Sequence, residues 1–314
     1  MTPGLASAKT KSASRQTYYT IRFLVDRQRV EDAYRAYGYF RWVDDVLDGD
    51  ALAATGSSPP DSLSRAQFLL RQQSLLDRCL QGEVPRDVSP HEAMLVELVR
   101  RSEGEDPRLQ AYLHNMMLVM DFDVQRRGRL VTDAELTEYT RWLATAVTEA
   151  MHYFIGSRAV APYDDLRYMA ATGAHIVHML RDTYADLQAG YFNVPREVLE
   201  AHAIDATDVR SAPYRAWVEG RVRLARACFA SGRAYLPRVP SRRHRLAALA
   251  YIGRFEWLTD VLEDENFVLR PHYGRRGRIT SALRIARDVV LSMSGIQTPS
   301  VARTDSAAPW AGQP

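Results

Sequence analysis

Hydrophobic positions recur at steps of three and four through most of the chain, which predicts amphipathic α-helices rather than strands. Helix ends are marked by Gly49, Gly82 and Gly190, and Thr132 with Glu135 forms the T-x-x-E pattern that opens a helix. The predicted helices span residues 29–48, 62–82, 89–102, 106–127, 135–156, 163–190, 213–236 and 241–267. No period-two alternation and no internal repeat is present. The fold class predicted is therefore all-α, a single bundle of about eight to ten helices.

The two ends of the chain differ from this pattern. Residues 1–13 and 297–314 are rich in Ser, Ala, Pro, Thr and Gly and lack periodicity, so we expect disordered tails around an all-α domain at 14–296. The N-terminal segment lacks the apolar core of a signal peptide, and we find no run of about 18 apolar residues. We therefore expect a cytoplasmic protein without a transmembrane segment.

Composition narrows the function classes. The chain carries 41 Lys and Arg against 38 Asp and Glu, a net charge of +3, so nucleic acid is not an expected partner. Cys79 and Cys228 are too few for a disulfide framework or a zinc site, and we expect both to lie in the core. The basic runs 241–246 and 274–279 are interpreted as solvated faces, with weak peripheral contact with anionic lipid as the alternative.

An acidic stripe lies in the predicted helix 29–48, within the segment FRWVDDVLD. Tyr37, Arg41, Asp44 and Asp48 follow one another at steps of three to four, with Asp45 beside them. The apolar residues of the segment occupy the opposite face, which can pack on a core. Aspartate is a mediocre helix former and is rarely buried without a partner, so this edge either faces water or holds a cation.

A second acidic stripe lies in the predicted helix 163–190. His178, Asp182 and Asp186 recur at every fourth position, Arg181 precedes Asp182, and His175 lies three positions before His178. Carboxylate oxygens on two helices suit Mg²⁺, which keeps several waters and takes few protein ligands besides a substrate phosphate. The pattern alone leaves two readings open: a metal–diphosphate site, or two solvated faces. Asp121 and Asp123 are interpreted as partners of the arginines that follow them.

These segments resemble motifs of a known family. YFRWVDDVLDG is similar to the first aspartate-rich motif of the squalene/phytoene synthase family, and HMLRDTYADLQAGYFNVPREVL is similar to the second. The likeness runs in order through about residues 14 to 270. It implies helices around a central apolar cavity that binds allylic isoprenyl diphosphates through Mg²⁺. On this resemblance Asp44, Asp48, Asp182 and Asp186 are the expected metal ligands, with Asp45 in support.

The resemblance also implies contacts with the diphosphate. Arg41 and Arg181 match the arginines that touch diphosphate in the family, and Tyr37 lies on the same stripe as Arg41. Ser14 and Arg15 match the start of a stretch that meets phosphate there. His178 replaces the family's asparagine, and we expect it to bind through water, contact diphosphate or act as a base, unless it is a core histidine.

Two further departures concern the acceptor. His175 stands where glutamine is common, and residues 144–148 read ATAVT where the family often has AGTVG. Thr145 and Thr148 add bulk, so we expect a reshaped cavity near them. The function expected is a Mg²⁺-dependent prenyltransferase whose acceptor is a second isoprenyl diphosphate, as in phytoene- or squalene-type head-to-head condensation. The alternatives are an aromatic small-molecule acceptor and a catalytically silent isoprenoid-binding partner, which the four intact aspartates argue against.

Overall fold

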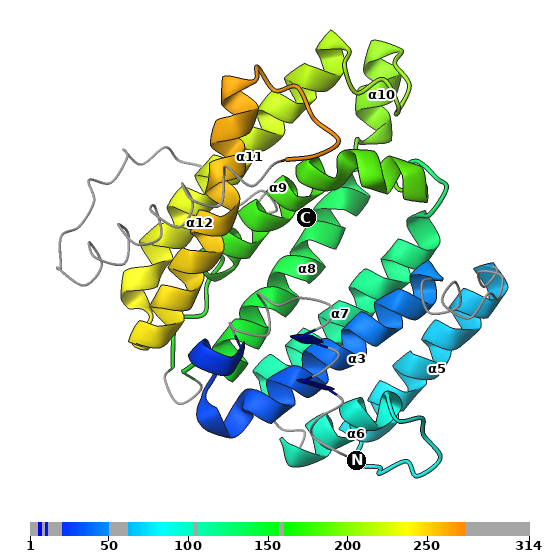
Figure 1. The fold of residues 1–314 in the computed structure, drawn as a ribbon, viewed down its shortest axis with the longest axis vertical. Coiled ribbons are helices and arrows are strands. Elements are labelled where there is room, and N and C mark those ends of the chain that lie inside the picture. The colour runs from blue at the N-terminus through cyan, green and yellow to red at the C-terminus, as the bar shows by residue number, and fades with distance from the viewer. Residues whose placement is uncertain are drawn as a thin grey trace. The chain divides into compact units, whose positions relative to one another are not determined.

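The computed structural model describes residues 6–7, 10–11, 21–49, 62–102, 106–156 and 160–273. Within these ranges the secondary structure is helical and contains no strand, which confirms the all-α prediction (Figure 1). Its α-helices are α3 Val30–Asp48, α5 Ser62–Leu80, α6 Glu92–Arg101, α7 Pro107–Arg126, α8 Asp133–Phe154, α9 Leu166–Ala189, α10 Arg196–His202, α11 Ala212–Tyr235 and α12 Arg242–Asp264. Two short 3-10 helices, η1 Arg27–Arg29 and η2 Leu236–Arg238, precede α3 and α12.

The predicted helices agree with these elements to within a few residues, and the predicted end signals have a physical basis. Gly49 and Gly190 end α3 and α9 with φ of 87° and 85°, a left-handed conformation that glycine adopts without strain. At the start of α8, Glu135 Oε2 accepts from the Thr132 backbone N–H at 2.8 Å, and the Thr132 hydroxyl accepts from the Glu135 N–H at 3.2 Å. Of the nine α-helices given above, α10 alone was not predicted, because seven residues give too short a pattern.

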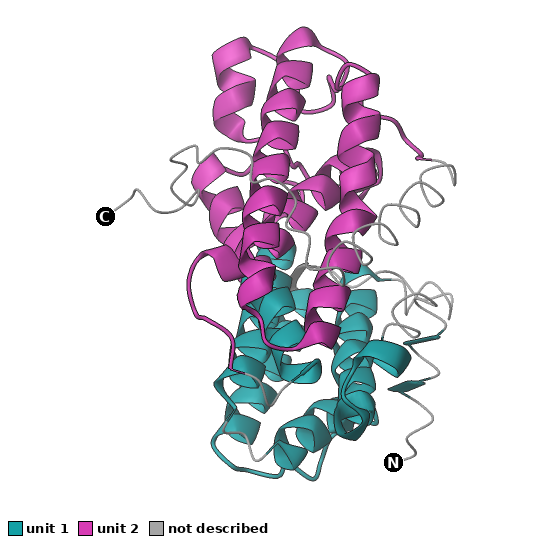
Figure 2. Ribbon diagram, turned by 90° about the vertical axis from the view of Figure 1, so that its left-hand side faces the viewer, with its two compact units in different colours: residues 1–125, 145–158 teal, residues 126–144, 159–314 magenta. Residues whose placement is uncertain are grey.

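The predicted domain boundaries fall on residues outside the described ranges. In the predicted tail 1–13, residues 6–7 and 10–11 are described and helical, and the Thr10 hydroxyl donates to the Ala6 carbonyl at 2.9 Å. The predicted boundaries near 14 and 296, and the whole of 297–314, lie outside. The contacts within the chain divide it into two compact units, residues 1–125 with 145–158 and residues 126–144 with 159–314 (Figure 2).

The first unit holds α3 through a buried polar network. Helix α6 packs against both α3 and α5. The Tyr39 hydroxyl of α3 donates to Gln72 of α5 at 3.1 Å, and Gln72 donates to Glu92 of α6 at 3.0 Å. Glu92 also accepts from Arg71 at 2.7 Å. Because these hydrogen bonds outweigh the effect of burial, the pKa of Glu92 falls to about 2, so the network keeps an ionised carboxylate in the interior.

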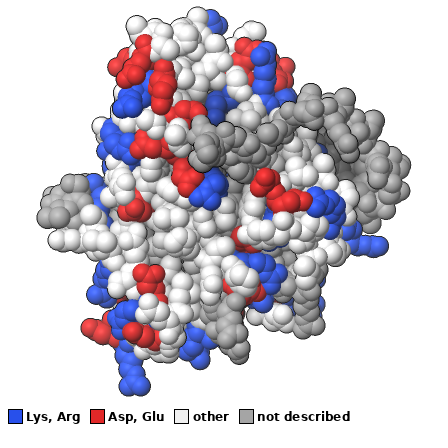
Figure 3. Space-filling model, turned by 180° about the vertical axis from the view of Figure 1, so that it is seen from behind, with Lys and Arg blue, Asp and Glu red and all other residues white. Residues whose placement is uncertain are grey.

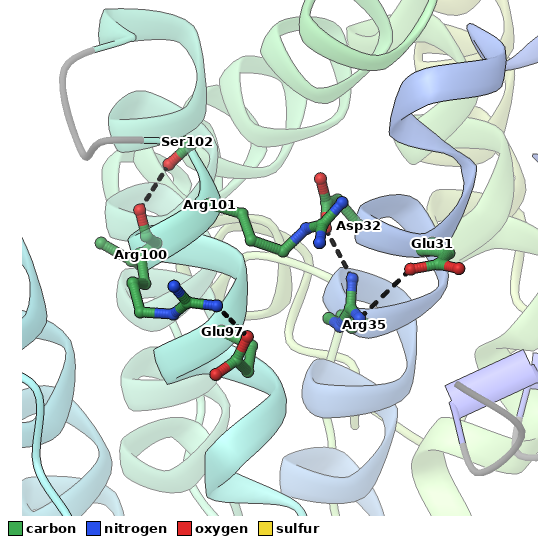
Figure 4. Close-up of polar contacts among 8 residues, drawn as sticks. Glu31, Asp32, Arg35, Glu97, Arg100, Arg101 and Ser102 are labelled. Carbon is green, nitrogen blue, oxygen red and sulfur yellow. Dashed lines mark hydrogen bonds and ion pairs between the residues drawn. The ribbon is translucent and has the colours of Figure 1, made fainter. Parts of the chain in front are cut away.

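A second link joins α3 to α6 near the start of α3. Asp32 is only 7% exposed and accepts from Arg35 of its own helix at 2.7 Å and from Arg101 of α6 at 3.0 Å (Figure 4). Glu31 pairs with Arg35, and Glu97 pairs with Arg100, on the more exposed side of the cluster. The two links fix both the axial position and the rotation of α3 against α6.

The second unit is built on the contact of α9 with α11. Helix α12 packs against both of them, and arginines of α11 pair with acidic residues of α12, as Arg233 does with Glu256. Two glycines allow the close approach: a Cβ on Gly173 of α9 would lie 2.9 Å from the Ala225 carbonyl oxygen, and one on Gly232 of α11 would lie 2.9 Å from the Ala170 backbone nitrogen. Helices α9 and α11 therefore touch nearly backbone to backbone.

We expect Gly232→Ala to destabilise the protein by about 1–3 kcal/mol, because the added methyl meets rigid backbone and forces α9 and α11 apart. The matched control is Gly220→Ala on the same helix, where an added Cβ meets nothing within 4 Å. That variant should gain about 0.5–1 kcal/mol from helix propensity. Urea denaturation of both variants measures the difference, and equal stabilities would show that the close approach does not exist.

The surface of the described residues carries charges of both signs. On the face drawn in Figure 3, acidic and basic side chains are intermixed, with no extended region of one sign. Arg242 and Arg243 of the first basic run are exposed at the start of α12, and the run 274–279 lies outside the described ranges. Of the helices described, none combines the length and the apolar character that a bilayer crossing requires.

Candidate functional site

The first acidic stripe lies on α3 as predicted. Val43 and Leu47, on the opposite face, are 0% and 6% exposed and anchor the helix in the core. Arg41 Nη1 lies 2.9 Å from Asp44 Oδ2, and its Nη2 lies 2.6 Å from Asp45 Oδ1. One guanidinium therefore bridges the two neighbouring carboxylates, with the side chains of Arg41 and Asp44 more than a third exposed.

The carboxylates of the α3 stripe crowd one another. Burial raises the pKa of Asp44 to about 7, with a further increase from the charge of Asp48, and Arg41 only partly offsets both. Asp123 of α7 and Asp45 add to the same increase. The stripe thus concentrates negative charge beyond what one arginine neutralises, which is the electrostatic condition for binding a cation.

The second stripe lies on α9, with Ile176 and Leu180 on the buried face at 1% exposed each. Arg181 donates from Nε and Nη2 to the two oxygens of Asp182, both at 2.7 Å. His178 Nε2 lies 2.9 Å from Asp182 Oδ2. The side chain of His178 is 48% exposed, so the alternative of a core histidine is wrong.

The two aspartates of α9 have opposite environments. Burial would raise the pKa of Asp182, but hydrogen bonds from Arg181 and His178 outweigh it and hold that pKa well below its usual range. The net effect of its surroundings raises the pKa of Asp186 to about 6. Burial is the largest cause, the hydrogen bond from Asn193 acts in the opposite direction, and the charge of Asp182 adds to the increase. Asp182 is therefore paired and ionised, whereas Asp186 has charge left to share with a cation.

His175 has a different environment from His178, one turn away. It is 5% exposed and its ring lies 5.0 Å from that of Tyr139, and among the residues that the structure describes neither of its ring nitrogens has a hydrogen-bond partner. Burial lowers its pKa well below the usual value, and the charges of His178 and Arg126 act in the same direction. The imidazole is therefore neutral, so one of its ring nitrogens carries a lone pair that can accept a hydrogen bond.

The donors fit a divalent cation only in combination with a ligand. In the parts of the chain that the structure describes, no three His, Cys, Asp or Glu side chains are gathered closely enough to hold a metal ion alone. The stripes offer hard carboxylate oxygens together with Arg41 and Arg181, which suits an ion that takes its remaining ligands from diphosphate and water. The α3 stripe belongs to the first compact unit and the α9 stripe to the second.

The remaining predicted site residues have different outcomes, and two site residues were not predicted. Tyr37 lies half-buried on α3, and Ser14 and Arg15 lie outside the described ranges. Sequence reasoning missed Asp123, which acts on Asp44 rather than only on nearby arginines, and Asn193, which bonds to Asp186 at 2.6 Å. Asp121 accepts from Gln125 at 2.7 Å. A sequence signal existed for both: Asp123 extends the set of aspartates on apolar helices, and Asn193 lies within the segment that resembles the second aspartate-rich motif, where only the aspartates, the arginine and the histidine were singled out.

Most of the predicted core residues are confirmed. Cys79 and Cys228 are buried free thiols. In α8, Thr148 is buried and Thr145 half-buried, so the bulk that replaces the expected glycines is turned toward the interior. Several aromatic residues of α3 and α8 are also buried in the core, among them Tyr34, Tyr39, Phe40, Tyr139, Tyr153 and Phe154.

Comparisons with known proteins agree with these motifs. The family described as squalene/phytoene synthase matches residues 10–281. Among solved structures, squalene synthase HpnC from Alicyclobacillus acidocaldarius is 21% identical, with a TM-score of 0.65, covering 85% of this chain and 95% of that one. A dehydrosqualene synthase in complex with a ligand is 14% identical, with a TM-score of 0.69, covering 93% and 96%. No protein with a curated description matches the sequence.

Proposed function

Because the chain belongs to the squalene/phytoene synthase family, whose members are prenyltransferases that release diphosphate, we propose that it condenses two isoprenyl diphosphates head to head. The observation that carries this proposal is the pair of acidic, arginine-bearing stripes on α3 and α9. Members of the family are enzymes, and the four aspartates of the stripes are intact in this chain. We therefore do not propose that the chain is a catalytically silent isoprenoid-binding partner.

We propose that Asp44, Asp48, Asp182 and Asp186 bind Mg²⁺, with Asp45 in support. Asp44 supports this role most directly, because its pKa is raised to about 7 by burial and by neighbouring carboxylates. When bound, Mg²⁺ neutralises the charge that develops on the leaving diphosphate. The two stripes would then act on the same diphosphate, which is the central claim of the proposal.

The arginines have a defined part in this scheme. Arg41 pairs with Asp44 and Asp45, and Arg181 pairs with Asp182. We propose that each guanidinium group donates hydrogen bonds from some of its N–H groups to diphosphate oxygens when substrate binds. The allylic C–O bond then breaks, its electron pair leaves with diphosphate, and the allylic carbon becomes cationic.

The cation is consumed by the acceptor. The π electrons of the second isoprenyl chain form the new C–C bond, which moves the positive charge to that chain, and loss of a proton gives a cyclopropyl diphosphate. If the second diphosphate then leaves with its electron pair, loss of a second proton gives a hydrocarbon. Aromatic side chains facing the reacting chains would stabilise the cation through their π faces and exclude water. We propose no reductant, and the product is accordingly a hydrocarbon or a cyclopropyl diphosphate of the combined chains.

An aromatic small molecule is a second candidate acceptor, and the two histidines of α9 favour it. Attack by an aromatic ring leaves a proton to be removed from the ring carbon, and a neutral imidazole is a suitable base. Buried His175 has no hydrogen-bond partner within the described part of the chain, and His178 replaces the family's asparagine beside Asp182. Such a reaction needs one diphosphate donor instead of two.

Mass spectrometry of the products tests both candidates. The protein is incubated with Mg²⁺ and farnesyl, geranylgeranyl or dimethylallyl diphosphate, with and without a panel of phenolic and indolic acceptors, and pyrophosphate is measured in parallel. Head-to-head condensation predicts release from one donor alone and a product with twice its carbon number. Release only in the presence of an aromatic compound would overturn that assignment, and no release from any donor would overturn the proposed prenyl transfer.

We expect His178→Asn to raise the rate of prenyl–prenyl coupling, because an amide oxygen is a better Mg²⁺ partner than an imidazole nitrogen. His114→Asn, on the exposed face of α7, is the matched control and should leave the rate unchanged. The measurement is the initial rate of pyrophosphate release at saturating Mg²⁺. A fall in that rate to background would mean that the imidazole itself is required.

A further inference from the structure

A buried chain of hydrogen bonds reaches Asp186 from behind the α9 stripe. Arg126, the last residue of α7, donates from Nη1 to Asn193 Oδ1 at 3.0 Å, and Asn193 Nδ2 donates to Asp186 Oδ2 at 2.6 Å. Arg126 is 6% exposed and Asn193 is 3% exposed. Neither residue was among the site residues expected from the sequence, although Asn193 lies within the segment that resembles the second aspartate-rich motif.

The orientation of the Asn193 amide follows from its neighbours. A guanidinium can only donate hydrogen bonds, so the group that Asn193 turns to Arg126 must be its carbonyl oxygen. The NH₂ group therefore faces Asp186, where it needs an acceptor. The arrangement is satisfied at every step when Asp186 presents an unprotonated oxygen.

Both ends of this chain are held rigidly. The Arg126 guanidinium lies 4.9 Å from the centre of the Tyr139 ring and 4.7 Å from that of Tyr191, so aromatic rings restrict its position. The turn that carries Asn193 is tied to α9, because the Tyr191 N–H donates to the Asp186 carbonyl at 2.7 Å. The Gly128 N–H donates to the Gly190 carbonyl at 2.8 Å, which joins the end of α7 to the same turn.

We infer that Arg126 and Asn193 are positioning residues that fix the Asp186 carboxylate for metal–diphosphate binding. Asn193 holds Oδ2, which leaves Oδ1 directed to the ligand, and Arg126 prevents the amide from rotating. This inference rests on the proposed function, since it assigns Asp186 a ligand. Partners of this kind behind a metal ligand are worth about 10–100-fold in affinity.

Isothermal titration of the full-length protein with inorganic pyrophosphate at fixed Mg²⁺ measures the effect without turnover. We expect Asn193→Leu, which matches the side chain in size, to weaken pyrophosphate binding by about tenfold. In turnover assays the variant should need more Mg²⁺ for half-maximal rate. Thr183→Val is the control, because Thr183 is a buried polar residue of the same helix whose hydroxyl donates to the Met179 carbonyl at 3.0 Å and is not a partner of Asp186 in the described structure. The melting temperature of this variant should fall while its affinity for pyrophosphate stays unchanged.

Arg126→Gln provides a second test if Asn193→Leu does not fold. The shorter amide keeps a donor near Asn193 but loses the charge and the ring contacts, so we expect a several-fold loss of affinity. If the wild-type protein binds pyrophosphate and the folded variants bind it with the same affinity, the inference is overturned and the proposed function stays intact. Absence of binding by the wild-type protein would overturn the proposed function itself.

Discussion

Asp44→Ala is expected to lower the rate of pyrophosphate release by a factor on the order of 10²–10³ or more, because it removes a central carboxylate of the α3 stripe. The substitution also frees the Arg41 Nη1 that now lies 2.9 Å from Asp44. Fold stability should not suffer, since removing one of several crowded carboxylates relieves repulsion. The expected result is an inactive protein with normal helix content.

The measurement combines initial rates with circular dichroism. Asp77→Ala is the control, because Asp77 is an exposed aspartate on α5, in the same compact unit but outside the stripe. It should retain the wild-type rate. If Asp44→Ala kept a near-normal rate, the metal role assigned to the first stripe would be wrong.

Asp182→Ala is expected to abolish turnover and to do so through two losses at once. It removes a proposed metal ligand, and it also removes the acceptor that holds Arg181 at 2.7 Å and His178 at 2.9 Å. Two cationic or polar groups then lose their fixed positions. We therefore expect a drop in rate at least as large as that of Asp44→Ala.

A matched control exists on the neighbouring helix. Glu219 of α11 pairs with Arg223, one turn further along the helix. Like Asp182 it is an acidic residue paired with an arginine of its own helix, but it lies outside both stripes. Glu219→Ala should leave turnover within about twofold, because exposed pairs of this kind contribute little. Near-normal activity in Asp182→Ala would remove the second stripe from the proposed site, whereas equal losses in both variants would indicate a general effect of losing an ion pair.

The fold was largely predictable because its signals are local. Helix periodicity, the glycines at 49 and 190 and the Thr132–Glu135 capping box each act over a few residues, and α3, α8 and α9 begin or end within a few residues of the predicted positions. The stripes were predictable for the same reason: Arg41 pairs with Asp44 three positions away, and His178 with Asp182 four positions away.

The remaining features depend on how the chain turns after α9 and on contacts with other helices. Nothing near Asp186 in the sequence indicates that Asn193 would turn back to bond with it, or that Arg126 would reach Asn193 from 67 positions earlier. The contrast between exposed His178 and buried His175 could not be predicted either. Residues three positions apart on a helix point in similar directions, so the packing of neighbouring helices such as α11 and α12 determines which one is buried.

A crystal structure of the protein with Mn²⁺ and inorganic pyrophosphate tests the central claim most directly, since anomalous scattering locates the metal ions. The account predicts that metal ions bound by Asp44 or Asp48 and metal ions bound by Asp182 or Asp186 contact one shared pyrophosphate. Metal peaks at only one stripe, or pyrophosphate bound away from both, would contradict it.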